Sequence, residues 1–333
     1  MDVPADLLAS LAALGLVEPG QRVVAEPLAG GVSSDIWRVD LEDGPVCVKR
    51  ALARLRVAQD WRAPVERNAY EVAWYETAAT VVPDAVPRVL AHDPARGLFV
   101  MTYLDPATHP LWKAELRDGR ADPEVAAGAA RAIAAVHAAT AGREDVAARF
   151  PTDAIFHAIR LEPYLEATAA RHPDLADALH DLVAVTATTR HALVHGDVSP
   201  KNVLVGPRGP VVLDAECAWY GDPAFDAAFC LNHLLLKCLW NPGARDGFLA
   251  CFDAFGAAYL ADARWEHAAA LERRTARLLP GLFLARVDGK SPVEYLTDEA
   301  GKERVRRVAR ALLAAPVERL SDVRAAWAEE LAR

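Results

Sequence analysis

The stretch LVHGDVSPKNVLV, residues 193–205, places a histidine, an aspartate, an asparagine and a lysine between two short apolar runs. The two runs, residues 193–194 and 203–205, predict short strands, so the polar segment is predicted to be a loop held at both ends. Loops positioned by a rigid scaffold are common places for chemistry. An ordinary turn whose aspartate and asparagine bond to the backbone would also explain this one loop, so the rest of the chain decides.

The composition is typical of a globular protein and limits the partners that the chain can have. Of its 333 residues 53% are hydrophobic and 25% are charged, which suffices for one large domain or two packed lobes. No apolar run reaches the roughly 18 residues of a membrane span, so no membrane partner is expected. The net charge of −9, without a cluster of Lys and Arg, argues against a nucleic-acid partner.

The cysteines and the N-terminal segment favour a cytoplasmic location. The five cysteines are widely spaced and form no CxxC pair, so neither a zinc site nor a disulfide framework is predicted. The first 16 residues, MDVPADLLASLAALGL, lack the basic flank of a secretory signal and predict a short amphipathic helix. We expect a cytoplasmic monomer or homodimer.

The hydrophobic pattern changes along the chain and predicts two lobes. Residues 1–102 contain short alternating runs that predict a small antiparallel sheet, with a hairpin at Asp43-Gly44 and one helix after Pro64. Residues 103–333 predict mainly helices, one of them opened by Asp122-Pro123. The predicted fold class is therefore α+β, with a sheet-based first lobe and a helical second lobe.

Two polar features of the first lobe suit a phosphate ligand. The segment GGVSSD, residues 30–35, lies between two predicted strands, where glycines let the backbone approach a phosphate. Lys49 lies inside an apolar strand, which is costly unless the charge has a partner, and Glu71 on the following helix is a candidate. The alternatives are a plain turn for the glycines and an exposed edge strand for Lys49.

The opening loop and a later aspartate suit a metal ion and a base. Asp197 and Asn202 lie five residues apart in H-G-D-x-x-x-x-N, and Asp214 follows the next apolar strand in VVLDAE. A short strand pair would return Asp214 to the side of Asn202. One carboxylate and one amide oxygen suit Mg²⁺, which retains waters and takes phosphate oxygens. Asp197 is then free to accept a proton.

In this order and spacing, the motifs HGDVSPKN, LDAE and GDPAFDAAF resemble those of the aminoglycoside phosphotransferase and choline kinase family, small-molecule relatives of protein kinases. The resemblance covers roughly residues 25–235. It implies a protein-kinase-like fold of two lobes and transfer of the γ-phosphate of ATP or GTP, with Mg²⁺, to a hydroxyl of a small molecule. The D-F-G and A-P-E signatures of protein kinases are absent.

The resemblance also implies a role for each residue of the motifs. Asp197 would be the catalytic base or the group that orients the acceptor hydroxyl. The implied nucleotide-binding residues are Lys49, Glu71, Gly30, Gly31, Ser33, Met101 and Tyr103, the last two through backbone groups that hold the purine. The implied metal ligands are Asn202 and Asp214, and the implied supporting residues are His195, Asp226 and Glu216. The sequence departs from the family at Ser33-Ser34-Asp35, because an acidic Asp35 would repel phosphates unless it points outward or caps a turn.

Several other polar and aromatic residues have a structural and a functional interpretation. His137 is predicted to be a structural histidine on the inner face of a helix. Trp219 and Tyr220 are predicted to be packing residues, although their place just after the metal strand also suits a substrate platform.

The acceptor is less well defined than the reaction. The segments FHAIRLEPYLEAT and ARVDGKSPVEYL break the helical pattern, and their Arg160, Arg286 and Lys290 suit a neutral or anionic acceptor. The segments SPKN and RLEPYL resemble the corresponding segments of methylthioribose kinases, so a sugar or polyol is the leading acceptor class. An aminoglycoside or a choline-like amino alcohol is the alternative acceptor. A nucleotide-binding pseudokinase that regulates a partner, and a metal-dependent phosphohydrolase, are the alternative functions.

Overall fold

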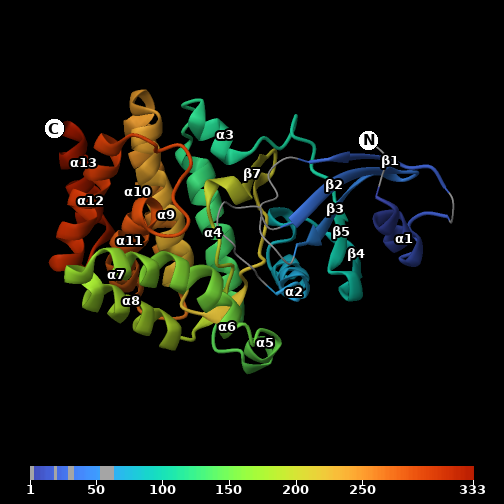
Figure 1. Ribbon diagram of the computed structural model, residues 1–333, viewed down its shortest axis with the longest axis horizontal. Coiled ribbons are helices and arrows are strands. Elements are labelled where there is room, and N and C mark those ends of the chain that lie inside the picture. Colours follow the sequence, from blue (N-terminus) through green and yellow to red (C-terminus); the bar gives the residue numbers. More distant parts are fainter. Residues whose placement is uncertain (1–3, 19–20, 29–33, 53–63) are drawn as a thin grey trace.

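The computed structural model describes residues 4–18, 21–28, 34–52 and 64–333. A five-stranded antiparallel sheet lies at one end of the molecule and a mostly helical part at the other, with the two termini at opposite ends (Figure 1). This arrangement confirms the predicted α+β fold. Strand β5 ends at Thr102 and the next helix begins at Trp112, while the boundary between the two lobes at residue 102 stays a prediction.

The sheet has the strand order β1-β2-β3-β5-β4, and all its pairs are antiparallel. Its strands are β1 (Val24–Pro27), β2 (Ser34–Leu41), β3 (Gly44–Ala51), β4 (Val89–Asp93) and β5 (Leu98–Thr102). The predicted hairpin joins β2 to β3, and Gly44 there has a φ of 115°, in the region that suits glycine. Lys49 is paired with Ile36 on one side and Phe99 on the other. It therefore lies on an inner strand, which excludes the exposed-edge alternative.

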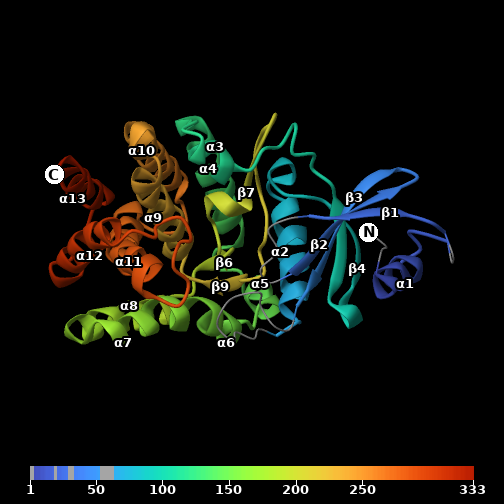
Figure 2. The same cartoon turned by 45° about the horizontal axis from the view of Figure 1, so that its top comes forward.

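Successive side chains of β3 point to opposite faces of the sheet, and each face packs against a different helix. Helix α1 (Ala5–Ala13) packs with Val46 and Val48 on one face of the sheet. The alternate residue Cys47 packs on the other face, in the cluster that contains Trp74 and Tyr75 of α2 (Arg67–Ala79). Lys49 is two residues after Cys47, so it points toward α2. Figure 2 shows α2 between the sheet and the helical part.

The helical part surrounds a buried central helix. Its helices are α3 (Trp112–Arg117), α4 (Pro123–Thr140), α5 (Glu144–Arg149), α6 (Asp153–Phe156), α7 (Ala167–Arg171), α8 (Ala176–Thr188), α9 (Ala224–Trp240), α10 (Arg245–Asp262), α11 (Ala268–Asp288), α12 (Glu299–Ala314) and α13 (Leu320–Ala332). Fifteen of the seventeen residues of α9 are buried, because α10, α11 and α13 pack around it. Asp122 caps α4 as predicted, accepting from the backbone N–H of Glu124 at 2.9 Å.

Two short strand pairs hold the loop with which the sequence analysis began. Strand β6 (Ala192–Val194) pairs with β9 (Trp219–Gly221), and β7 (Val203–Gly206) pairs with β8 (Gly209–Val212). The predicted strands on both sides of the loop are thus confirmed. Single turns of 3₁₀-helix occur at η1 (Pro83–Ala85), η2 (Pro94–Arg96), η4 (Pro173–Leu175), η5 (Pro200–Asn202) and η6 (Pro242–Ala244).

The segment around Pro163 differs from the prediction. We expected residues 156–168 to break the helical pattern, whereas residues His157–Glu166 form a π-helix, η3, that continues from α6 into α7. The wider turn of a π-helix accommodates the ring of Pro163 inside a continuous helix. No helix among the described residues is both long and apolar enough to cross a membrane.

Candidate active site

The loop between β6 and β7 is buried although it is rich in polar side chains. Exposure is 0% for His195, 2% for Asp197 and 5% for Asn202. Its last residue is tied to the strand pair that follows, because the backbone N–H of Leu213 donates to the carbonyl of Asn202 at 2.8 Å. Polar groups at this depth need partners, and each of the three side chains has them.

Asp226, in the first turn of α9, holds the start of the loop. Its Oδ2 accepts from the backbone N–H of His195 at 2.8 Å, and its Oδ1 accepts from that of Gly196 at 2.7 Å. The Nε2 of His137 lies 3.1 Å from the same Oδ2. His137 is therefore a buried structural histidine, as predicted, and it orients Asp226 from α4.

The side chain of His195 is fixed on both ring nitrogens. Its Nδ1 accepts from the backbone N–H of Asp197 at 3.1 Å, and its Nε2 lies 3.1 Å from the carbonyl oxygen of Leu213. These contacts assign the proton to Nε2. Burial lowers the pKa of His195, and the indole of Trp74 packs edge-on against its ring at 4.8 Å. His195 thus links the loop to β8 and to α2.

A glycine is required between His195 and Asp197. Gly196 has a φ of 79°, in the left-handed region. A Cβ atom at this position would lie 2.5 Å from the carbonyl oxygen of Cys217. Any other residue would be strained by its backbone angle and would also collide with a neighbouring chain segment.

Asp197 has more partners than the sequence analysis expected. Its Oδ2 accepts from the Nδ2 of Asn202 at 2.9 Å and lies 3.0 Å from both Arg160 and Lys201. It is therefore not wholly free, because the loop and η3 supply two cations to it. All these contacts reach Oδ2, which leaves Oδ1 for another ligand. Burial opposes its charge, but Arg160 and Lys201 hold the pKa of Asp197 below its ordinary value.

Arg160 and Lys201 were not identified as parts of the site from the sequence. We expected Arg160 to suit the acceptor, and in the structure its guanidinium also bonds to the loop, donating from Nε to the carbonyl of Gly196 at 2.5 Å. Lys201 lies inside the loop motif, four residues after Asp197, and this spacing was the available signal in the sequence. In the structure the 3₁₀ turn of residues 200–202 brings the two side chains together. Burial lowers and Asp197 raises the pKa of Lys201, with a net rise above its ordinary value.

Asn202 and Asp214 present hard oxygen atoms. The Nδ2 of Asn202 donates to the backbone oxygen of Asp197 at 3.0 Å as well as to its carboxylate, so both amide hydrogens are used and Oδ1 remains as an acceptor. Asp214 has a φ of 67°, unusual for a residue other than glycine. Its backbone N–H donates to the hydroxyl of Tyr75 at 2.7 Å, which helps to hold that conformation.

Lys49 joins the two parts of the molecule. Its Nζ donates to Oε1 of Glu71 at 2.7 Å and also contacts the carboxylate of Asp214. The ion pair between Lys49 and Glu71 that we predicted is therefore present, with Lys49 3% and Glu71 1% exposed. The hydroxyl of Tyr75 bonds to Glu71 at 3.2 Å and so links this pair to the backbone of Asp214.

Lys49, Glu71 and Asp214 shift one another's pKa values. Burial opposes the charge of Lys49, but the carboxylates of Asp214 and Glu71 hold its pKa well above the ordinary value. Burial also disfavours the charge of Asp214, yet Lys49 and Lys201 lower its pKa far below the ordinary value. Burial, with Asp214 and Glu216 nearby, raises the pKa of Glu71 to about 7 in spite of Lys49. Buried ionisable groups that shift one another's pKa values are typical of functional sites.

Glu216 is held by an arginine that the sequence analysis did not single out. Its Oε2 lies 2.9 Å from Nε of Arg67, a buried residue at the start of α2. The same guanidinium donates to the carbonyls of Pro64 at 2.8 Å and Leu52 at 2.7 Å. Glu216 therefore ties the strand end to α2 through this ion pair.

The remaining nucleotide-side residues are only partly described. Gly30, Gly31 and Ser33 lie outside the described residues. The neighbouring Asp35 bonds to the guanidinium of Arg50 at 2.9 Å. Arg50 therefore compensates the negative charge that the sequence analysis expected to repel phosphates.

Two further predicted residues lie on and just after β5. Met101 faces Cys47 of β3 across the sheet. Tyr103 follows the end of β5 and lies under the guanidinium of Arg38 at 5.3 Å. The structure thus places both at the end of the sheet nearest the connection to α3, while their contact with a purine remains a prediction.

Two aromatic residues that could have formed a substrate platform are packing residues. Trp219 and Tyr220 are 1% and 4% exposed in β9. The ring of Trp219 stacks on Phe156 at 4.2 Å, and the hydroxyl of Tyr220 donates to backbone carbonyls.

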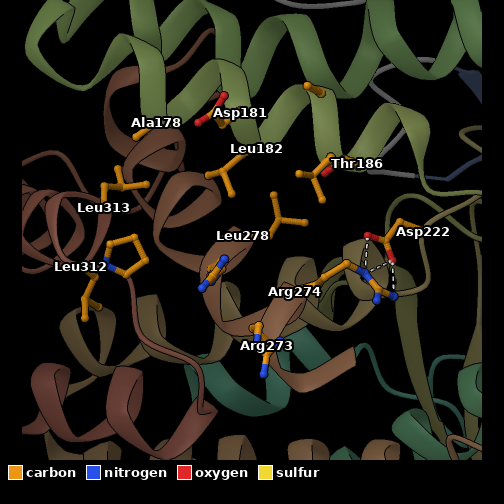
Figure 3. A pocket seen from close by; sticks show the side chains of 14 residues that line it. Ala178, Asp181, Leu182, Thr186, Asp222, Arg273, Arg274, Leu278, Leu312 and Leu313 are labelled. Carbon is orange, nitrogen blue, oxygen red and sulfur yellow. Dashed lines mark hydrogen bonds and ion pairs between the residues drawn. The ribbon is translucent and has the colours of Figure 1, made fainter. Parts of the chain in front are cut away.

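A cavity of about 380 Å³ lies away from the loop, between α8, α11 and α12 (Figure 3). Its wall is largely apolar, with Leu182, Leu278 and Leu312 among the lining residues. The guanidinium of Arg274 there bonds to Asp222 and Glu266, so its charge is compensated. None of the residues that line this cavity belongs to the predicted site.

Comparisons with known proteins were made for sequence and for structure. A model of the phosphotransferase enzyme family matches residues 24–274, more than half of the chain. The methylthioribose kinase of Pectobacterium carotovorum subsp. carotovorum (strain PC1) is 28% identical over 261 residues, which cover 69% of this chain and 64% of that protein. The methylthioribose kinase of Yersinia enterocolitica is 25% identical, covering 68% and 64%. The match thus spans less than two thirds of these relatives.

Solved structures share the fold at low sequence identity. An ethanolamine kinase of Plasmodium vivax has a TM-score of 0.56 and 12% identity, covering 92% of this chain and 87% of that chain. A choline/ethanolamine kinase family protein of Mesorhizobium loti has a TM-score of 0.51 and 19% identity, covering 96% and 98%. These similarities establish a fold with a small sheet-based lobe and a larger helical one.

Proposed function

The chain belongs to the phosphotransferase enzyme family, and on that premise we propose that it transfers the γ-phosphate of ATP to a hydroxyl group of a small sugar or polyol. The observation that carries the proposal is the contact of Lys49 with both Glu71 and Asp214. It brings a phosphate-binding lysine of the sheet to the strand end beside the loop of Asp197. A phosphohydrolase does not need such a lysine, and the loss of Lys49, Asp197, Asn202 or Asp214 that would have favoured a pseudokinase has not occurred.

The residues present fit a magnesium ion. Asp214 offers a carboxylate and Asn202 an amide oxygen, and Mg²⁺ in nucleotide sites is bound by one or two such groups together with phosphate oxygens and waters. Among the described residues no group of three or more His, Cys, Asp and Glu side chains could hold a metal by itself. Bound there, Mg²⁺ would neutralise charge on the phosphate oxygens.

The protein's own residues bind and orient the reactants. Lys49 binds phosphate oxygens, and Glu71 keeps its ammonium group aimed at them. Asp197 stays ionised because of Arg160 and Lys201. Its Oδ1 can therefore accept a hydrogen bond from the acceptor hydroxyl and take its proton late in the transfer. Asp226 and His195 keep the loop in position, which matters because catalysis of phosphoryl transfer depends on placement and charge.

A sugar or polyol acceptor is supported by the relatives and by the site. The methylthioribose kinases match 69% of the chain at 28% identity. Two cations, Arg160 and Lys201, flank Asp197, which disfavours a polycationic aminoglycoside beside the reacting hydroxyl.

The test is an acceptor screen with matched variants. ADP release is measured with Mg-ATP and, in parallel, Mg-GTP, across methylthioribose, ribose, other sugars, polyols, choline and aminoglycosides. The product is identified by the mass gain of one phosphoryl group. We expect release that depends on a sugar or polyol and is lost after Asp214→Ala or addition of a chelator. A rate that Asp214→Ala leaves unchanged, or no acceptor-dependent release at all, would contradict the proposal.

A further inference from the structure

A cluster of basic and aromatic side chains lies near the C-terminal end of α9, beyond the residues used so far. His233 and Lys237 are one helical turn apart on α9, so they share a face. The Nζ of Lys237 lies 4.1 Å from the ring centre of Trp240 and 3.9 Å from that of Tyr295. The two rings stack at 4.3 Å. Arg286 of α11 completes what we call the α9 basic cluster: His233, Lys237, Arg286 and Tyr295.

The α9 basic cluster is buried, and several of its donors lack acceptors, although Nη1 of Arg286 donates to the hydroxyl of Tyr164 and to Ser291. Lys237 is 1%, His233 5% and Arg286 8% exposed. Nε2 of His233, Nε of Arg286 and the hydroxyl of Tyr295 have no hydrogen-bond partner among the described residues. No described residue accepts a hydrogen bond from Nζ of Lys237 either. Buried donors without acceptors cost stability, and all four side chains can donate.

Positive charge around this cluster exceeds negative charge. Burial lowers the pKa of His233 far below its ordinary value, and the charges of Arg286, Lys237, Lys201 and Lys113 lower it further. Burial lowers the pKa of Lys237 to about 6, and Glu294 only partly opposes this. Glu294 is itself paired with Lys113. An added negative group would be attracted by the guanidinium of Arg286, and it would favour the protonated forms of Lys237 and His233, which burial now disfavours.

Contacts connect the cluster to the reaction site. Arg160, which pairs with Asp197 at 3.0 Å, also lies over the ring of Phe229 at 5.4 Å. The ring of Phe229 is in turn 5.4 Å from that of His233. From the other side, Arg286 donates to the hydroxyl of Tyr164 at 3.1 Å, and Arg160 lies over the same ring at 5.7 Å. The cluster thus adjoins the Asp197 side of the site, on elements remote from Lys49.

We propose that the α9 basic cluster binds an anionic group, a phosphate or a carboxylate, carried by the hydroxylated acceptor. The inference rests on the proposed function for the identity of the ligand as acceptor, while anion binding itself does not depend on transfer. The anion supplies acceptors for Lys237, Arg286 and His233 together. The aromatic pair of Trp240 and Tyr295 is already occupied by the ammonium group of Lys237, which leaves this pair unavailable to a quaternary ammonium acceptor.

The first experiment measures binding without nucleotide or metal. Calorimetry compares ribose 5-phosphate with ribose, and gluconate with glucose, on the full chain. We expect the charged member of at least one pair to bind about tenfold or more tightly, and Lys237→Met to remove that difference. The phosphate and carboxylate pairs separate the two sources of negative charge.

Two variants serve as controls for the binding experiment. Lys302→Met removes a lysine of α12 whose ammonium group pairs with Glu299 at 3.8 Å, outside the cluster, and should change nothing. Lys49→Met tests whether the anions occupy the nucleotide site. Equal binding of charged and neutral members, loss of the difference in Lys49→Met with retention in Lys237→Met, or tight binding of choline would each overturn the proposal.

A second experiment separates this inference from the proposed function. With the charged acceptor and Mg-ATP, Lys237→Met should raise the KM of the acceptor about ten- to hundredfold and leave the KM of ATP unchanged. Selective anion binding without any transfer would contradict the proposed function and leave the anion site standing. Transfer to neutral sugars with the same KM in wild type and Lys237→Met, and no preference for charged ones, would contradict the anion site and leave the kinase activity standing.

Discussion

Replacing Asp226 by asparagine tests whether one buried carboxylate holds the catalytic loop. Asp226 is fully buried and accepts three hydrogen bonds, from the backbone N–H groups of His195 and Gly196 and from the ring of His137. Asparagine has the same shape but only one acceptor oxygen. Whichever way its amide is turned, an NH₂ group faces at least one N–H donor.

The magnitude follows from counting these bonds. A buried N–H left without an acceptor costs about 1–3 kcal/mol, and each bond that changes from a charged to a neutral acceptor loses about 1 kcal/mol. We therefore expect Asp226→Asn to lower the free energy of unfolding by about 3–5 kcal/mol. With an unfolding entropy of about 2.1 cal/mol/K per residue and 333 residues, the Tm falls by about 4–7 °C.

Thermal melts followed by circular dichroism measure the Tm, and amide hydrogen exchange shows where the effect lies. Exchange at the His195 and Gly196 amides should accelerate first, because one of the two acceptor oxygens of residue 226 is removed and the other loses its charge. A displaced loop should also lower kcat by about 10²-fold with little change in the KM of ATP. The matched control is Asp181→Asn, at an exposed position of α8. A Tm within about 1 °C of wild type, with unchanged exchange, would refute this role of Asp226.

Three further predictions address the reaction and the α9 basic cluster. Asp197→Asn should lower kcat by roughly 10²- to 10⁴-fold at saturating acceptor, because the amide cannot take the proton; equal kcat would remove Asp197 from the mechanism. Lys49→Met should raise the KM of ATP with the acceptor KM unchanged, and Glu71→Gln should give a milder form of the same defect; steady-state kinetics check both. Lys237→Met should stabilise the fold. The pKa of Lys237 is lowered from 10.5 to about 6, so between these values the unfolded chain binds more protons and wild-type stability rises with pH. In denaturant unfolding the variant's advantage should thus be about 4 kcal/mol larger at about pH 6 than at about pH 9, and a pH-independent difference would contradict the assignment.

The sequence by itself determined the features that depend on local pattern and spacing. The alternation in residues 34–51 and the Asp43-Gly44 turn define the hairpin, and Asp122-Pro123 defines the start of α4, because backbone geometry there depends on neighbouring residues. The spacing from His195 to Asn202, between two apolar runs, predicted a loop held by strands. The same motifs predicted the family, and the cost of a lysine inside an apolar strand predicted the pair of Lys49 and Glu71.

Tertiary structure decided which distant side chains complete the site. Arg160 reaches Asp197 only because η3 stays helical around Pro163, and Arg67 reaches Glu216 across 149 positions of sequence. The α9 basic cluster joins residues of α9, α11 and the segment after it. No sequence period encodes such contacts, since they arise from the packing of helices against one another. Burial then lowers the pKa of Lys237, whereas Arg160 and Lys201 hold the pKa of Asp197 below its ordinary value against its burial, because the pKa of a group depends on everything that surrounds it.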